Sequence, residues 1–101
     1  MSSNWISKSV RQAIYNRDER ACIYCGTTEQ HAVLSLDHIT PRTLGGALTD
    51  PTNLVTACCH CNSTRGTMSL KAFQAYLGLH FEIVTVKDLS AKVRRQARKA
   101  L

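Results

Sequence analysis

The spacing of the cysteines restricts the fold of this chain more than any other feature. Two Cys-x2-Cys pairs are present, one formed by Cys22 with Cys25 and the other by Cys58 with Cys61. Each pair brings two sulfur atoms close enough to share one tetrahedral cation, and Zn²⁺ is the metal that four thiolates select. We therefore expect a structural zinc ion that clamps the two ends of the intervening segment onto the start of the segment that follows. Buried or redox-active thiols are the alternative.

The remaining candidate ligands lie inside or beside the second pair. Cys59 is the fifth cysteine, and we expect it to be packed inside the protein rather than bound to metal. We also expect His60 not to be a ligand. The odd number of cysteines, with no apolar segment after the amino terminus, favours a reducing compartment, the cytoplasm. In that compartment the paired cysteines are better interpreted as metal ligands than as disulfides.

Charge and composition limit the class of partner. The chain of 101 residues carries a formal net charge of +6, and 44% of its residues are hydrophobic. It has room for one domain with one core, which we place at residues 1–101. Four thiolates and one zinc ion would lower the charge to roughly +4, which still favours a polyanion such as nucleic acid. No stretch approaches the ~20 apolar residues that cross a bilayer, so we expect no membrane role.

Apolar periodicity and turn residues predict an α+β fold. The predicted elements are, in chain order, a helix at Ser7–Arg20, a metal-binding turn at Ala21–Thr28, a strand at Val33–His38, a turn-rich loop at Ile39–Thr52, a strand at Asn53–Ala57, a helical segment from Cys58 broken near Gly66, a helix at Ser69–Leu77, a strand at Phe81–Val86 and a basic amphipathic helix at Asp88–Leu101. We expect a core at about residues 11–78 with the basic helix outside it.

Four polar residues are candidates for chemistry. Asp37 and His38 end the first predicted strand, Asn53 begins the second, and Asn62 follows the second cysteine pair. Each has a simpler interpretation: Asp-His pairs are usually capping or surface residues, Asn53 fits an Asx turn after Pro51, and Asn62 fits a helix cap. Their order along the chain, interleaved with the cysteine pairs, is what suggests a shared site.

In this order the residues resemble the HNH endonuclease family with its ββα-metal (His-Me finger) motif. The resemblance covers about Arg11–Met68. It is carried by Cys22-x2-Cys25, by Leu36-Asp37-His38-Ile39-x-Pro41 with Gly45-Gly46, by Asn53-Leu54-Val55 and by Cys58-x2-Cys61-Asn62 ending at Arg65-Gly66. The resemblance implies a ββα-metal core with a four-cysteine zinc site and flanking helices, and a metal-dependent nuclease that hydrolyses phosphodiester bonds in DNA.

The resemblance also implies a role for each candidate. His38 is the expected general base, because an imidazole of pKa about 6.5 removes a proton from water near neutrality. Asp37 and Asn62 are expected to bind one divalent cation, and Asn53 to fix the loop whose backbone orients His38. Asn62 stands where the family often has histidine. Since an amide oxygen favours hard cations, we expect Mg²⁺ or Mn²⁺ rather than Zn²⁺ or Ni²⁺.

DNA contacts are expected from basic residues. Arg42 and Arg65 are candidates to contact phosphate, with a solvated surface charge as the equal alternative. The candidates on the basic helix are Lys92, Arg94, Arg95 and Arg98. No sequence-reading motif is evident, so we expect weak, salt-dependent binding with low sequence preference. The alternative is a helix packed along Leu89 and Val93 with a solvated charged face.

Two other functions compete with a free-standing nuclease. A non-catalytic zinc-stabilised module that binds nucleic acid would explain the cysteines and the charge, but not the four polar residues in family order. A small phage or prophage nuclease that assists a terminase in DNA packaging, in the cytoplasm of a bacterial host, is the second. Packaging, restriction and homing roles, nicking or double-strand cleavage, and oligomeric state are all left open by the sequence.

Overall fold

The computed structural model describes residues 5–81 and 88–101. Its elements, in chain order, are α1 (Lys8–Arg17), β1 (Leu34–His38), the short 3-10 helices η1 (Arg42–Leu44) and η2 (Pro51–Asn53), β2 (Leu54–Cys58), α2 (Cys59–Arg65), α3 (Leu70–Phe81) and α4 (Leu89–Ala97). The α+β class predicted from the sequence is confirmed.

The two strands form an antiparallel hairpin, which has the second cysteine pair at one end and Asp37, His38 and Asn53 at the other. Leu34 pairs with Cys58 at one end, and His38 pairs with Leu54 at the other. The loop between the strands contains η1 and η2. The second strand begins one residue later than predicted, because Pro51 and the side chain of Asp50 start a helical turn that includes Asn53.

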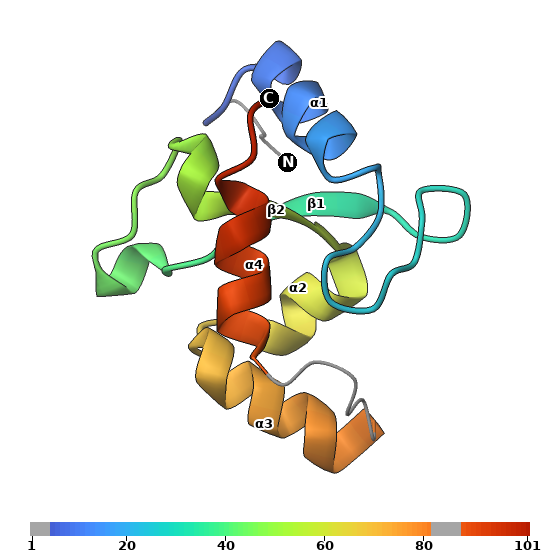
Figure 1. Cartoon of the computed structure of the whole chain (residues 1–101), viewed down its shortest axis with the longest axis vertical. Coiled ribbons are helices and arrows are strands. Elements are labelled where there is room, and N and C mark those ends of the chain that lie inside the picture. The colour runs from blue at the N-terminus through green and yellow to red at the C-terminus, as the bar shows by residue number, and fades with distance from the viewer. Residues whose placement is uncertain (1–4, 82–87) are drawn as a thin grey trace.

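Both faces of the hairpin are covered by helices (Figure 1). On one face, Ile14 and Tyr15 of α1 pack with Leu36 and Leu54. On the other, Val55 and Ala57 belong to a larger apolar cluster. The members of that cluster from the later helices are Cys61, Leu70, Phe73, Leu77, Leu89, Val93 and Ala97. β2 is therefore buried along its whole length, which makes the hairpin a rigid support for the residues at its two ends.

The first helix begins as predicted and ends earlier. The hydroxyl of Ser7 accepts the N–H of Val10 and caps α1. The helix stops at Arg17 rather than Arg20, because the backbone has φ of 59° at Glu19 and 51° at Arg20, which a right-handed helix does not allow. This left-handed step turns the chain toward the first cysteine pair.

The last two helices differ from the predictions at their ends. α3 continues to Phe81, beyond the predicted end at Leu77, and the predicted strand at Phe81–Val86 otherwise lies outside the described residues. Asp88 caps α4, which ends at Ala97.

Within the described part of the chain, no helix has both the length and the apolar character needed to cross a bilayer.

A buried ion pair at the end of α1 ties four elements together. Nε of Arg17 lies 2.8 Å from Oδ1 of Asp18, and both side chains are 1% exposed. The further hydrogen bonds of this pair reach η2, β2 and α4, through Pro51, Leu54, Thr56, Gln96 and Ala97. The sequence indicated Arg17 only as a charged residue of an amphipathic helix.

Substitution of Asp18 by Asn should make the stability of the protein less sensitive to acid. Burial alone would raise the pKa of Asp18, but hydrogen bonds from Arg17, Gln96 and Thr56, together with the Arg17 charge, lower it below its ordinary value of 3.8. A carboxyl with a lowered pKa stabilises the fold above its unfolded pKa, and this contribution is lost as the pH falls through the folded pKa. In urea unfolding of the zinc-loaded protein, with zinc in excess, wild type and Asp18→Asn should therefore differ more at about pH 7 than at about pH 4, close to the ordinary Asp pKa. An equal difference at both pH values would contradict this.

Candidate active site and metal centre

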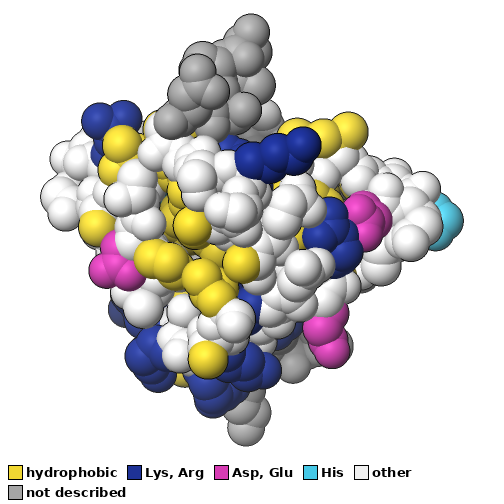
Figure 2. All heavy atoms as spheres, turned by 90° about the horizontal axis from the view of Figure 1, so that it is seen from above, with side chains coloured by type: hydrophobic (Ala, Val, Ile, Leu, Met, Phe, Trp, Pro, Cys, Tyr) yellow, Lys and Arg dark blue, Asp and Glu magenta, His cyan; other side chains and the backbone are white. Residues whose placement is uncertain are grey.

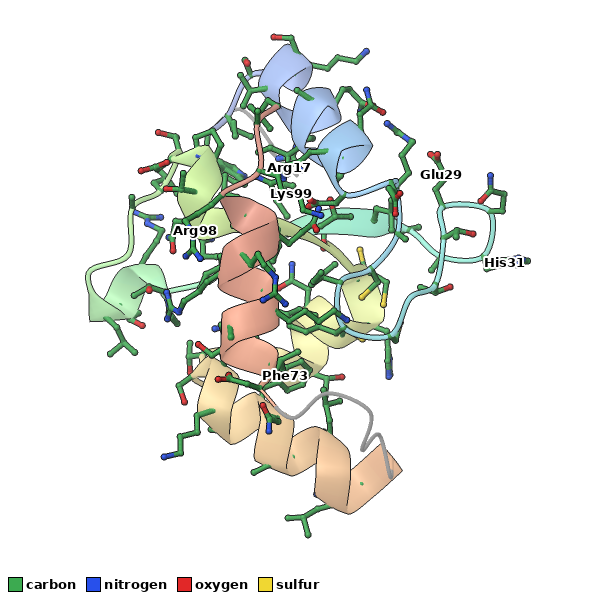
Figure 3. The ribbon with its side chains drawn as sticks, in the orientation of Figure 1. Arg17, Glu29, His31, Phe73, Arg98 and Lys99 are labelled. Atoms are coloured by element: carbon green, nitrogen blue, oxygen red, sulfur yellow. The ribbon has the colours of Figure 1, made fainter. Side chains whose placement is uncertain are left out.

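The four paired cysteines converge at the end of the hairpin where Leu34 pairs with Cys58. The sulfur atoms of Cys22, Cys25, Cys58 and Cys61 all lie within 4.8 Å of one another. Figure 3 shows the sulfur atoms gathered beside α2. The predicted convergence of the two pairs on one metal site is confirmed.

Local hydrogen bonds favour the thiolate form of Cys22, the form that binds metals. The backbone N–H of Tyr24 donates to Sγ of Cys22 at 3.4 Å, and that of Cys61 donates to Sγ of Cys58 at 3.3 Å. A hydrogen bond from the Cys61 thiol lowers the pKa of Cys22 to about 4, although burial opposes this. The same contact raises the pKa of Cys61. Four sulfur ligands of this kind suit a tetrahedral cation of the Zn²⁺ type.

Cys59 and His60 lie outside the cluster. The prediction that Cys59 is packed inside is wrong, because its side chain is exposed. Cys59 is the first residue of α2, and successive helical residues point in directions about 100° apart, so it does not share the buried side of Cys61. His60 is exposed and is not part of the four-sulfur group, and its not being a ligand stays a prediction.

At the other end of the hairpin, three of the four candidate catalytic residues line one open groove of about 250 Å³. The groove lies among the end of β1, η1 and α2, and is lined by Leu36, Asp37, His38, Pro41, Arg42, Thr43, Asn62, Gly66 and Thr67. Asp37 and His38 come from adjacent strand positions, whose side chains point to opposite faces. Both border the groove because β1 ends there.

The ring of His38 is held by the loop and by the N-terminal segment. Its Nε2 lies 2.9 Å from the carbonyl oxygen of Leu48. Because a carbonyl oxygen only accepts hydrogen bonds, Nε2 carries the proton and Nδ1 of the neutral ring is an acceptor. The ring of Trp5 lies against the imidazole, with 5.2 Å between centroids. The neutral ring can therefore take up a proton at Nδ1.

Asn53 holds the loop that contains Leu48. Its Oδ1 accepts the N–H of Thr40 at 2.9 Å, and its Nδ2 donates to the carbonyls of Thr40 and Ala47, the latter at 2.8 Å. The loop is tight: a Cβ on Gly46 would lie 1.8 Å from the carbonyl oxygen of Thr40. These contacts place Asn53 where the sequence-based hypothesis requires it, and its role in catalysis stays a prediction.

Asp37 is buried and ion-paired. Nη1 of Arg65 lies 2.6 Å from Oδ2 of Asp37, and the Tyr24 hydroxyl bonds to the same oxygen. The Arg65 side chain is 0% exposed. Arg65 also donates to three backbone carbonyl oxygens, those of His38, Ile39 and Met68. The expectation that Arg65 contacts phosphate or is solvated is therefore wrong, because the guanidinium is enclosed and neutralises a buried carboxylate.

The remaining oxygens of Asp37 and Asn62 are of the chemical type that binds a divalent cation. Nδ2 of Asn62 donates to Oγ of Ser35 at 2.9 Å and to the carbonyl of Leu36 at 3.2 Å, which orients the amide. Among the described residues, Oδ1 of Asn62 and Oδ1 of Asp37 then have no hydrogen-bond partner. Carboxylate and amide oxygens are ligands that Mg²⁺ and Mn²⁺ accept.

Comparison with known proteins agrees with this geometry. Residues 22–77, more than half of the chain, match a family model described as HNH endonuclease. The chain belongs to the HNH endonuclease family. It is also 34% identical, over 74 residues, to the CRISPR-associated endonuclease Cas9 of Actinomyces naeslundii. That match covers 73% of this chain and 6% of Cas9, so the chain spans a small part of its relative. No solved structure is significantly similar to it.

The HNH match and the fold describe the same core. The matched residues contain both cysteine pairs, β1, β2 and α2. Two antiparallel strands followed by a helix, with a four-cysteine cluster, form the ββα-metal core that the sequence resemblance predicted. The flanking helices of this HNH chain are α1, α3 and α4.

The predicted DNA-contacting residues of the HNH chain lie in different settings. Arg42 is exposed in η1 and lines the groove, so its guanidinium is available to a phosphate there. On α4, Leu89, Val93 and Ala97 are buried, and Lys92 is half-buried with its ammonium on the Ile23 carbonyl. The exposed basic residues of this helix and its end are Arg94, Arg95, Arg98 and Lys99.

Basic side chains also gather on the outside of the HNH chain. Figure 2 shows several Lys and Arg side chains at the lower edge of the face seen from above. Arg98 and Lys99 extend from the end of α4 that lies near Arg17 (Figure 3). α4 is thus both packed along its apolar face and charged on its exposed face, which leaves the basic face available to a polyanion.

Sequence reasoning missed three groups at the HNH site. The Tyr24 hydroxyl contacts Asp37, the Leu48 carbonyl sets the proton position on His38, and Trp5 lies against the His38 ring. Tyr24 could have been singled out from the sequence, because it lies between the two cysteines of the first pair. Burial, followed by the negative charge of Asp37, raises the pKa of Tyr24, so the hydroxyl keeps its proton. A backbone carbonyl and a distant aromatic ring leave no sequence pattern.

Proposed function

We propose that this HNH chain is an endonuclease that hydrolyses phosphodiester bonds in DNA with the help of a divalent cation. One observation carries the proposal: the His38 ring, held by its Nε2 bond to Leu48, borders a groove that it shares with Asp37 and Asn62. The similarity to Cas9, an endonuclease by name, supports it. We place the nuclease in one domain, residues 1–101, with its ββα-metal motif inside about 11–78 and α4 packed against the same apolar cluster.

In this mechanism His38 is the general base. It removes the proton of the attacking water at Nδ1, since Nε2 is bonded to the Leu48 carbonyl. The Nε2–H bond also stabilises the ring once it is protonated, because the carbonyl dipole faces the new positive charge. Asn53 acts through the loop that carries Leu48, and keeps the ring in its orientation.

Asp37 and Asn62 are the residues that would hold Mg²⁺ or Mn²⁺. The cation, when bound, supplies positive charge that neutralises the leaving oxygen. Asp37 contributes a carboxylate that is already fixed by Arg65, and Asn62 an amide that is fixed by Ser35. Arg42, exposed at the edge of the groove, is positioned to hold a DNA phosphate.

We further propose that the four-cysteine site holds a structural Zn²⁺. The four thiol ligands and their N–H···S bonds support this choice over an oxygen-seeking cation. A reducing cytoplasm would keep these thiols free to bind it.

The exposed arginines of α4 would add sequence-independent contacts to phosphates, so DNA binding should be weak and strongly salt-dependent. A packaging role beside a phage terminase rests on the family resemblance alone, and an adjacent terminase gene would support it.

A plasmid-nicking assay tests the nuclease. The purified, zinc-loaded chain should convert supercoiled plasmid to open-circular or linear DNA when Mg²⁺ or Mn²⁺ is added, and should not do so with EDTA at a level that leaves the zinc bound. The zinc content, measured after each reaction, shows that the fold was intact. A folded, zinc-loaded protein that binds DNA but does not cleave it, whichever divalent cation is added, would instead identify a non-catalytic zinc module.

A further inference from the structure

Tyr24 links the four-cysteine cluster to the groove at the other end of the hairpin. It stands between Cys22 and Cys25, and its backbone N–H donates to Sγ of Cys22 at 3.4 Å. The hydroxyl at the far end of the same residue bonds to Oδ2 of Asp37. One residue therefore contacts a ligand of the cysteine site and a ligand of the proposed cation site.

The direction of each hydrogen bond in this network follows from chemistry. Arg65 has donors and no acceptor, so its Nη1 donates to the Tyr24 oxygen at 3.2 Å and to Oδ2 of Asp37 at 2.6 Å. The Tyr24 oxygen accepts from Arg65, and its single proton points to Asp37. Oδ2 of Asp37 thus receives two donors, which fixes the carboxylate plane, and Oδ1 receives none from residues 5–81 and 88–101.

The ring of Tyr24 is fixed as firmly as its hydroxyl. The residue is 6% exposed, and the ring packs edge-on against Phe73, with 5.0 Å between centroids. Phe73 is a residue of α3 and is itself 0% exposed in the apolar core. Loss of the hydroxyl would therefore leave the ring in place, so the role of the oxygen atom can be tested apart from that of the ring.

We propose that Tyr24 is a positioning residue that fixes the Asp37 carboxylate for divalent-cation binding, and so couples the cation affinity of the groove to the folding of the four-cysteine site. The inference rests on the proposed function, in which Asp37 holds the cation. Hydrogen-bond partners of ligands commonly change metal affinity about 10–100-fold when they are removed, because they hold the ligand in its binding orientation.

The direct test measures Mn²⁺ binding to zinc-loaded Tyr24→Phe. Electron paramagnetic resonance detects the free Mn²⁺ at each point of the titration. We expect the affinity to fall about 10–100-fold. Cleavage should be slow at low Mn²⁺ and recover toward the wild-type rate at saturating Mn²⁺. A residue that only supports the fold would lower thermal stability without moving the Mn²⁺ binding curve.

Tyr15→Phe is the matched control. Tyr15 is buried in α1, and its hydroxyl donates to the carbonyl of Leu34 at 3.3 Å, away from Asp37. This variant loses the same atom and should bind Mn²⁺ as the wild type does. Equal Mn²⁺ affinity of wild type and Tyr24→Phe would overturn the inference and leave the nuclease intact. A wild type that neither binds Mn²⁺ nor cleaves DNA would instead overturn the proposed function, and this inference with it.

A measurement on the wild type avoids any loss of folding. With ¹³C-labelled tyrosine, the Cζ resonance of Tyr24 should shift during Mg²⁺ titration with the same midpoint as cation binding, because its hydroxyl is bonded to the ligand carboxylate. The Tyr15 resonance should not move. A Tyr24 resonance that stays constant while Mg²⁺ binds would contradict the coupling.

Discussion

His38→Ala should reduce DNA cleavage about 10²–10⁴-fold while leaving the fold and the zinc content unchanged. The expected loss is large because His38 is the imidazole that lines the groove, with Nε2 bonded to a carbonyl and Nδ1 free to take up a proton. The side chain is half-buried, so its removal costs little packing. Single-turnover nicking of supercoiled plasmid at saturating Mg²⁺ measures the chemical step without the contribution of product release.

The matched control is His31→Ala. His31 is exposed and extends away from the rest of the molecule in Figure 3, so this variant loses the same imidazole at a site remote from the groove. It should cleave as the wild type does. If His38→Ala also cleaved at the wild-type rate, His38 would not be the general base, and another group in the groove would have to be sought.

Removal of the metal from the four-cysteine site should unfold the core of the protein. Structural zinc contributes about 10–16 kcal/mol of apparent binding energy in small domains, which is comparable with the whole stability of such a domain, about 5–15 kcal/mol. The four sulfur atoms connect the turn at residues 22–25 to β2 and α2, which form the core. A strong zinc chelator should therefore abolish the far-ultraviolet circular dichroism of the folded state, in step with zinc release measured by a colorimetric dye.

Two neighbouring cysteines provide the control for this experiment. Cys58 is buried and lies in the four-sulfur group, whereas Cys59 is exposed and lies outside it. Cys58→Ser should lose zinc and fold poorly, and Cys59→Ser should keep both its zinc and its melting temperature. Loss of zinc from Cys59→Ser, or a folded, zinc-free Cys58→Ser, would show that the metal site differs from the four-sulfur cluster.

Much of the candidate site was predictable, because its residues occupy places that local patterns mark. The end of β1 followed from the alternation of residues 33–38, and this located Asp37 and His38. Cysteine spacing located the metal site. The burial of Arg65 was not predictable, because it does not follow from spacing, and the exposure of Cys59 followed only from the position of the start of α2. A charged residue is usually exposed and a cysteine usually buried, and here tertiary contacts reversed both tendencies.

The amino-acid sequence by itself determined which four cysteines converge, the α+β class and the chain order of the polar residues, because each depends on short-range spacing. The tertiary structure alone decided how these residues are oriented. Arg65 and Tyr24 hold the Asp37 carboxylate, Asn53 holds the loop, and the Leu48 carbonyl sets the proton on His38. The partners in these contacts come from separate segments of the chain, and several are backbone atoms that every residue type carries, so no sequence pattern encodes them.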